Sequence, residues 1–198
     1  MSFIKKIFII SFFLIFISCE SDKVYVLVEP GKVEIEKIYS ATTNKKWSQF
    51  QERTYNFLFW TVDGYTLQRI VFFKPIEDGS SLFDQESFFT KENKKRPIFD
   101  SKMNKFEIKE FFENCIIWSR EFTNFETTDI KNYKIGDAEG VSFDIKAQNE
   151  LGLNYKGFAV VGIKNKKFYS VYFIASEMEF YDKYKNEAKK IISSIKIL

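Results

Sequence analysis

The sequence contains no histidine and only two cysteines, Cys19 and Cys115. Without an imidazole, the chain cannot build a Ser-His-Asp or Cys-His catalytic group, and it cannot bind zinc through histidine. It also has neither a Gly-x-Gly-x-x-Gly run nor a P-loop, so the sequence gives no support for nucleotide binding. We therefore expect a protein that is not an enzyme, with no catalytic residues, no metal site and no cofactor.

Strong charge of one sign is also missing, because the formal net charge is only +3. Two of the lysines, Lys5 and Lys6, belong to a short N-terminal segment that carries no acid, so the rest of the chain is close to neutral. A near-neutral domain offers no argument for a nucleic acid partner.

The N-terminal segment has the layout of a secretory signal peptide. Lys5 and Lys6 precede an apolar run over residues 7–17, which is followed by Ser18 and Cys19. A helix of about eleven residues rises roughly 17 Å, well short of the ~30 Å hydrocarbon core of a bilayer. The segment is therefore too short to be read as a membrane-spanning helix.

Residues 16–19, Phe-Ile-Ser-Cys, resemble a bacterial lipobox. The resemblance implies cleavage between Ser18 and Cys19 and lipid attachment to Cys19, where buried acyl chain contributes ~0.8 kcal/mol per methylene. Glu20 stands where related proteins carry the aspartate that favours retention in the inner membrane, so we expect the outer membrane. An ordinary signal peptide with a chance cysteine is the alternative. The expected organisation is a signal peptide (1–18), a lipidated tether (19–23) and one domain (24–198).

The pattern of apolar residues predicts an antiparallel sheet with two helices. The strands over 154–163 and 167–175 carry apolar residues on both faces, so they should lie centrally in the sheet. Asp63-Gly64 between two apolar runs predicts a hairpin. Further strands are expected over residues 24–28, 33–39, 55–61, 65–74 and 139–147.

Two helices are predicted from capping signals and periodicity. Asn104 with Glu107, and Ser176 with Glu179, have the spacing of capping boxes, and the second helix should end near Ser194. In the first helix an apolar face predicts that Cys115 is a small buried residue. The other residues expected on that face are Phe106, Ile108, Phe111, Phe112 and Ile116. The fold class is therefore α+β, a sandwich of helices and an antiparallel sheet.

Several motifs together resemble a family of uncharacterised bacterial envelope lipoproteins. The central one is Phe59-Trp60-Thr61-x-Asp63-Gly64-x-x-Leu67, followed by Ile76-x-Asp78-Gly79-x-x-Leu82. The resemblance continues through Pro97-x-Phe99-x-x-x-Met103, Glu107, Glu110, Gly140-x-x-Phe143, Gly157, Ala175 and Ile191-Ile192-Ser193-Ser194.

The C-terminal pattern of paired strands, an alanine and a closing helix more distantly resembles the PsbP-like fold. That resemblance implies an antiparallel sheet between helices, in an α/β/α sandwich. Known members include an extrinsic photosystem II subunit and a Ran-GTPase-binding protein, which act mainly by binding proteins. A shared fold transfers the architecture and not the function.

The carboxylates are the first candidate site. Asp63 and Asp78, with Glu77 and Asp84, could form an acid/base pair or a calcium site, because neighbouring carboxylates shift each other's pKa. The simpler interpretation is turn chemistry, since each aspartate precedes a glycine in a tight turn. The spacing of an EF-hand loop is absent.

The remaining candidates are basic and aromatic. Lys94, Lys95 and Arg96 could contact phosphate head groups or anionic polymers, or form a solvated loop. Trp47 lies among polar residues and could be an exposed interface anchor or a core residue. Trp60, in a strongly apolar strand, is expected in the core. Trp118 is the third tryptophan that could contribute to an aromatic platform.

The predicted function is that of an envelope lipoprotein held on the membrane by its lipid, with a non-catalytic domain that faces the periplasm and binds an envelope protein. A first alternative is a small-molecule or glycan site in a cleft with Trp47 or Tyr65 at its mouth. A carboxylate-based hydrolase is the third possibility. An exposed apolar patch favours the first, a closed polar cleft the second, and two facing carboxylates the third.

Overall fold

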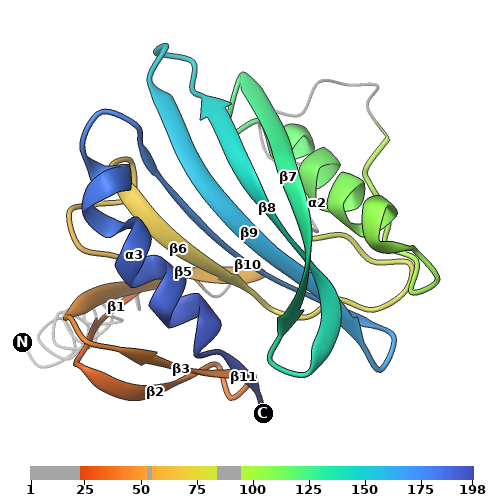
Figure 1. The fold of residues 1–198 in the computed structure, drawn as a ribbon, viewed down its shortest axis with the longest axis horizontal. Helices are drawn as coiled ribbons and strands as arrows, with labels where there is room; N and C mark the ends of the chain where they lie inside the picture. Colours follow the sequence, from red (N-terminus) through yellow and green to blue (C-terminus); the bar gives the residue numbers. More distant parts are fainter. Residues whose placement is uncertain (1–22, 53–54, 84–94) are drawn as a thin grey trace, which may run out of the picture.

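The computed structural model describes residues 23–52, 55–83 and 95–198, which form two sheets and two helices (Figure 1). The strands of the large sheet are β1 (Lys23–Val28), β4 (Trp47–Glu52), β5 (Phe57–Thr61), β6 (Gln68–Phe73), β7 (Asn124–Ile135), β8 (Ala138–Gln148), β9 (Asn154–Lys164) and β10 (Lys167–Ser176). The small sheet contains β2 (Gly31–Ile35), β3 (Tyr39–Thr43) and β11 (Lys196–Ile197). The helices are α2 (Lys105–Ser119) and α3 (Phe180–Ser193).

The large sheet has eight strands in the order β1-β4-β5-β6-β10-β9-β8-β7, and all its pairs are antiparallel. β10 and β9 lie in the middle of the sheet, and most of their side chains are more than nine-tenths buried. This confirms the prediction from their two-sided apolar pattern. The hairpin around Asp63-Gly64 is also confirmed, although its strands are shorter than predicted. Residues 62–67 form its turn, in which Gly64 has a φ of 119°.

Helix α2 covers one face of this sheet, mainly over β7, β8 and β9 (Figure 1). Its predicted capping box is confirmed, since Asn104 accepts from the backbone of Glu107 and Glu107 accepts from the backbone of Asn104. Ile108, Phe111, Phe112, Cys115 and Ile116 are buried as expected. Phe106 is 65% exposed, so its assignment to the buried face was wrong.

Helix α3 and the small sheet cover the opposite face. Tyr184, Ala188 and Ile191 of α3 pack with Trp60 and Phe173 of the large sheet in a second core. The predicted Ser176–Glu179 capping box is wrong: Ser176 ends β10 and donates its backbone N–H to Leu67, and α3 has no side-chain cap. Layers on both faces give the predicted α+β sandwich with an antiparallel sheet at its centre. Neither helix of the described residues is long and apolar enough to cross a bilayer.

The N-terminal third differs from the prediction in two places. A single strand was expected over residues 33–39, but the chain turns at Glu36 and Lys37, where φ is 54° and 56°. No strand was predicted over residues 41–53, yet this stretch contains the end of β3 and the whole of β4. These strands carry serine, threonine and glutamine beside a few large apolar residues, so they show little alternation.

Two glycines of the resemblance motifs have a packing role in the central strands. A β-carbon at Gly140 would overlap the carbonyl oxygen of Val161, and one at Gly157 would overlap that of Phe173. Neither glycine has a positive φ. They are therefore needed for the close approach of neighbouring strands and not for backbone freedom.

Candidate interaction surfaces

The first candidate surface is a pair of adjoining open grooves beside α2. One has a volume of about 490 Å³ and the other about 760 Å³, and Pro97, Ile98 and Asn114 line both. We call them together the α2 groove. Ile98 is 40% exposed and Ile117, on the same side of α2, is 36% exposed. Apolar side chains that remain in contact with solvent are typical of a surface that binds another macromolecule.

The two ends of the α2 groove carry opposite charge. Lys95 and Arg96 line the larger groove together with Trp118. Around the smaller groove the acids Asp100, Glu107 and Glu110 outnumber Lys102. The surface therefore presents an apolar centre between a basic end and an acidic end, which would select the direction of a bound segment.

The second candidate surface lies on the far side of the molecule from α2, at β1 (Figure 1). An aromatic row runs across β1, β4 and β5 on the face of the sheet that carries α2. Its ring centroids are 4.9 Å apart between Tyr25 and Phe50, 4.9 Å between Phe50 and Phe59, and 4.8 Å between Phe59 and Tyr65. The row extends beyond α2, whose main contacts are with β7, β8 and β9.

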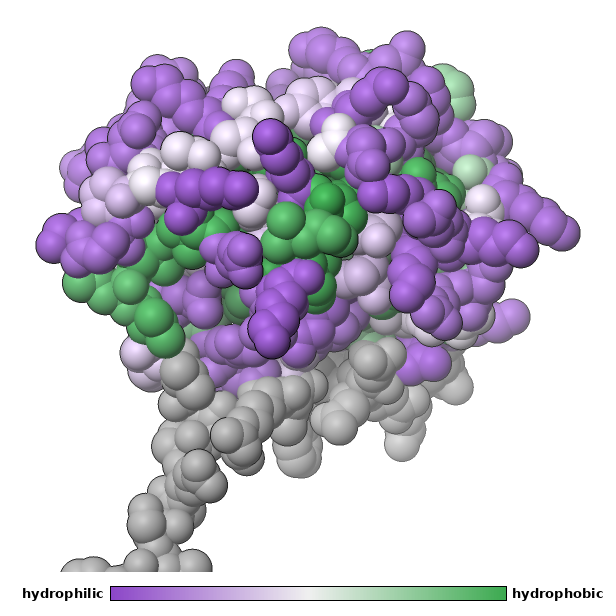
Figure 2. All heavy atoms as spheres, turned by 90° about the horizontal axis from the view of Figure 1, so that it is seen from below, coloured by the Kyte–Doolittle hydropathy of each residue, from purple (hydrophilic) through white to green (hydrophobic). Residues whose placement is uncertain are grey.

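Exposure along this row increases toward the edge of the sheet. Phe59 is 7% exposed, whereas Tyr25 is 74% and Leu27 57% exposed. Tyr55, stacked on Phe57 at 5.1 Å, is 44% exposed. We call Tyr25, Leu27 and Tyr55 the β1 face. In Figure 2 most of the surface is hydrophilic, and apolar patches interrupt it at the centre and on the left, the side on which β1 lies in Figure 1.

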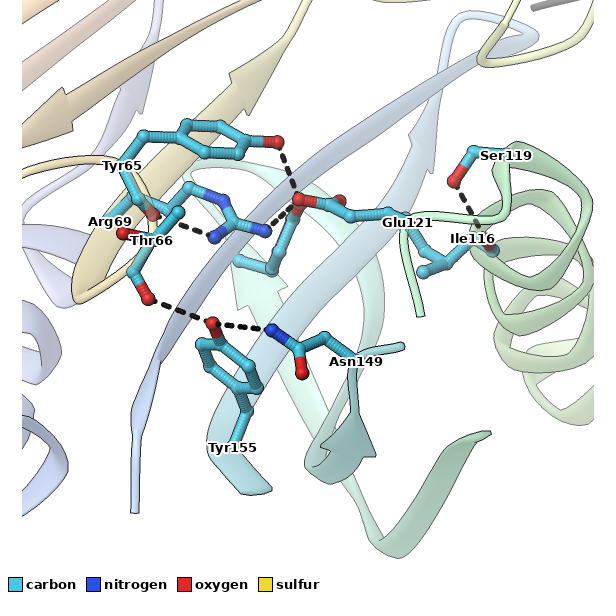
Figure 3. Close-up of polar contacts among 9 residues, drawn as sticks. Tyr65, Thr66, Arg69, Ile116, Ser119, Glu121, Asn149 and Tyr155 are labelled. Atoms are coloured by element: carbon cyan, nitrogen blue, oxygen red, sulfur yellow. Dashed lines mark hydrogen bonds and ion pairs between the residues drawn. The ribbon is translucent and has the colours of Figure 1, made fainter. Parts of the chain in front are cut away.

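A buried ion pair closes the inner end of the aromatic row (Figure 3). Arg69 of β6, with a side chain 2% exposed, pairs with Glu121, which follows α2. One Nη of Arg69 donates to the carbonyl oxygen of Tyr65 at 2.9 Å, and its guanidinium lies 4.1 Å from the centroid of the Tyr65 ring. The Tyr65 hydroxyl donates to the same Glu121 carboxylate. The Tyr172 hydroxyl lies 3.5 Å from the other oxygen of that carboxylate. We call Arg69, Glu121, Tyr65 and Tyr172 the Arg69 cluster.

Burial and charge together fix the protonation of this cluster. Burial, followed by the nearby Glu121 carboxylate, raises the pKa of Tyr172. Burial also raises the pKa of Tyr65, although the Arg69 cation opposes the shift. For Arg69 burial is the largest single effect and lowers the pKa, but Glu121, Tyr65 and Tyr172 together outweigh it and the net shift is upward. The cluster therefore holds a cation and two neutral phenols near pH 7.

The Arg69 cluster joins two parts of the fold. The described grooves are lined by other residues. Beside it, the Tyr155 hydroxyl donates to the Thr66 carbonyl oxygen at 2.9 Å and lies 3.5 Å from Nδ2 of Asn149 (Figure 3). Together, the Arg69–Glu121 pair and the contacts of Tyr155 connect the loop after β5 and the start of β6 to the segment that follows α2 and to β9. Their effect is to hold the end of α2 and Tyr65 in place.

The sequence analysis did not identify this cluster. Arg69 is a charged residue within the apolar run that became β6, and a charge in a buried strand requires a partner. That signal was present, but Glu121 lies 52 residues further along the chain, and no local spacing connects the two.

Trp47 is a core residue, and its alternative role as an exposed anchor was wrong. Its side chain is 1% exposed, its Nε1 donates to Oγ1 of Thr43 at 3.0 Å, and its ring packs 6.1 Å from that of Tyr184. Trp60 is fully buried, as predicted. Trp118 is 6% exposed and lines the larger part of the α2 groove.

Asp63 and Asp78 are not brought together. They lie beyond opposite ends of β6, because Gln68 pairs with Ala175 near the first turn and Ile76 pairs with Phe168 near the second. Asp63 forms a 3.4 Å ion pair with Lys183, and Asp78 accepts from the backbone and hydroxyl of Ser101. The hydrogen bonds from Ser101 lower the pKa of Asp78. The structure thus separates the two carboxylates that the hydrolase or calcium interpretation would pair.

The other predicted positions are only partly covered. Ser18, Cys19, Asp84 and Lys94 lie outside the described residues. Cys115 is fully buried, and burial raises its pKa to about 11, which suits an unreactive thiol. In the part of the chain that the structure describes, no three acidic or cysteine side chains are grouped so that they could hold a metal ion.

The chain matches no family model, and no curated protein matches it. Among solved structures, it is similar to the PsbP protein (CyanoP) of the cyanobacterium Synechocystis sp. PCC 6803, with 8% identity and a TM-score of 0.50 over 92% of this chain and 96% of that one. A Bacteroides thetaiotaomicron protein has 13% identity and a TM-score of 0.47, and the match covers 86% of this chain. This chain spans about half (49%) of that protein's length. The first likeness shows the fold: the protein has a PsbP-like α+β fold.

Proposed function

We propose that this protein is a lipid-anchored lipoprotein of a bacterial cell envelope whose domain binds a segment of another envelope protein in the α2 groove. Cys19 carries the lipid, and the domain faces the periplasm, from the outer membrane. The lipobox-like residues 16–19 and the short apolar run before them support the anchor. Tethering acts by raising the effective concentration of the domain next to any membrane-bound partner.

The observation that carries the binding role is the form of the α2 groove. It is open and elongated, with exposed apolar side chains at its centre, whereas small-molecule sites enclose most of their ligand. The charges at its ends specify the chemistry of the partner. The bound segment should have an apolar centre, with acidic residues that lie beside Lys95 and Arg96 and basic residues that lie beside Glu110. Trp47 was one of two residues expected at the mouth of a glycan cleft, and its burial weakens that alternative.

Two measurements test the proposal separately. Intact mass of the native chain tests the anchor, with Cys19→Ala as control: we expect a diacylglyceryl-plus-acyl mass on a chain that starts at Cys19, and its loss in the variant. A chain that is cleaved elsewhere and carries no lipid would remove the tethering role.

The binding role is tested by a photo-crosslinking residue at position 114 in intact envelopes. Asn114 is exposed and lines both grooves. The matched control is position 151, since Leu151 is 92% exposed in the turn between β8 and β9 and lines neither groove. We expect a discrete crosslinked product from position 114 alone, which the substitutions Lys95→Glu and Arg96→Glu reduce. Equal products from both positions would contradict a specific site in the groove.

A further inference from the structure

The two edges of the large sheet are protected very differently. Edge strand β7 has a register shift between Thr128 and Lys131, where Asp129 has a φ of 54°, and it carries two acidic and two basic residues. Edge strand β1 runs in unbroken register with β4, and Tyr25, Val26 and Leu27 on it are 46–74% exposed. A bulge and charges are the usual means of keeping an edge in water. β7 therefore has the features of a solvated edge, and β1 has those of an edge that contacts something apolar.

The position of the expected anchor limits what β1 can contact. Only three residues, Glu20 to Asp22, separate Cys19 from the first residue of β1. A fully extended chain of this length spans at most about 14 Å from Cys19 to Lys23. An acylated Cys19 lies at the level of the lipid head groups, so the start of β1 is held within about 14 Å of that level.

The side chains of the β1 face suit that location. Tyrosine is enriched at membrane–water interfaces, because its ring enters the apolar boundary while its hydroxyl stays hydrated. Tyr25 and Tyr55 flank the half-buried rings of Phe50 and Phe57, and Leu27 adds an aliphatic group. The open backbone edge of β1 still requires hydrogen-bond partners, which head groups and interfacial water supply and hydrocarbon does not.

We propose that the β1 face lies on the membrane surface, at the boundary between head groups and acyl chains. The proposal rests on the proposed acylation of Cys19. It adds that the domain is not free to rotate at the end of its tether, because a second apolar contact fixes its orientation. With β1 against the bilayer, α2 lies over the strands at the other edge of the large sheet, away from the edge that contacts the lipid (Figure 1).

The test uses the acylated protein reconstituted into phosphatidylethanolamine–phosphatidylglycerol vesicles. An environment-sensitive fluorophore is attached through Leu27→Cys on the β1 face, or through Leu151→Cys as the matched control. Both side chains are well exposed, at 57% and 92%, so neither substitution disturbs the core. The native Cys115 is buried, and labelling of the acylated parent protein measures its background.

We expect the probe at position 27 to emit at shorter wavelength and to be quenched several-fold more strongly by lipids spin-labelled near the head group than the probe at position 151. Equal quenching at both positions would overturn the proposal while leaving the anchor intact. A wavelength shift that appears only at high protein-to-lipid ratio would also overturn it, because a second copy would then cover β1.

The anchor is checked first, by intact mass of the same sample. A chain without lipid would refute the proposed function and this proposal together. A lipidated chain with equal quenching at both positions would refute this proposal alone, so the two failures are distinguishable. The double variant Tyr25→Ser/Leu27→Ser gives a further check, with a fluorophore carried on Tyr55→Cys. We expect this variant to keep its lipid and to lose most of the quenching at position 55.

Discussion

Removing the carboxylate of the Arg69 cluster should destabilise the fold strongly. In Glu121→Leu, the Arg69 guanidinium stays in a site where its side chain is 2% exposed, without its ion-pair partner. Deleting one partner of a buried ion pair costs about 3–5 kcal/mol. Glu121 is itself 22% exposed, and Arg69 keeps its 2.9 Å bond to the Tyr65 carbonyl oxygen, so water and that bond compensate in part. We expect a loss of about 2–4 kcal/mol in the free energy of unfolding.

Urea unfolding followed by tryptophan fluorescence measures this loss, because Trp47 and Trp60 are buried in the folded domain. With a slope of about 2 kcal/mol/M, the midpoint should fall by roughly 1–2 M. The control is the double variant Arg69→Met/Glu121→Leu, which removes both charges and should lose less than Glu121→Leu alone. A change below about 0.5 kcal/mol in Glu121→Leu, within the range of ordinary surface substitutions, would refute the reasoning. The reasoning would also be refuted if the double variant lost as much free energy of unfolding as the single variants Arg69→Met and Glu121→Leu lose in sum.

Three other outcomes are expected. Asn104→Ala removes the N-cap of α2 and should cost about 1 kcal/mol in urea unfolding, and recovery in Asn104→Asp would identify the cap as the cause. Stability should fall as the pH rises above about 10, because burial raises the pKa of Tyr39 and Tyr172 in the folded chain above their unfolded value; ultraviolet absorbance should then show tyrosinate appearing together with unfolding, and gradual ionisation of these phenols in a folded chain would contradict this. Cys115 should resist alkylation at pH 8 in the folded protein and react in urea, whereas equal rates would contradict its burial.

The central and C-terminal strands could be predicted from the sequence because their patterns are decided locally. β9 and β10 are apolar on both faces, a pattern that only a central strand satisfies, and the Asn104–Glu107 box depends on residues three apart. The same reasoning failed at Ser176 and Glu179. There the spacing is right, but the backbone of Ser176 is paired to Leu67, so it continues the sheet instead of capping the helix.

The parts of the candidate surfaces that were missed depend on contacts between distant segments. Trp47 is surrounded by polar neighbours in the sequence, and it is buried because the ring of Tyr184 on α3 packs against it. Trp118 and the basic pair Lys95 and Arg96 were each noted separately, but only the fold places them along one groove. A local pattern predicts which face of a strand or helix is apolar, and it does not predict which other element covers that face.

A continuous series of side-chain contacts connects the two proposed surfaces through the domain. The aromatic row begins at Tyr25 on β1 and ends at Tyr65, which stacks on Arg69, and Arg69 pairs with Glu121 at the end of α2. Packed side chains and a buried ion pair transmit a rigid displacement, because a close-packed interior has little free volume to absorb it. In the proposed arrangement, whatever orients β1 on the bilayer therefore also orients the α2 groove. The domain would therefore present its groove in one fixed direction relative to the bilayer.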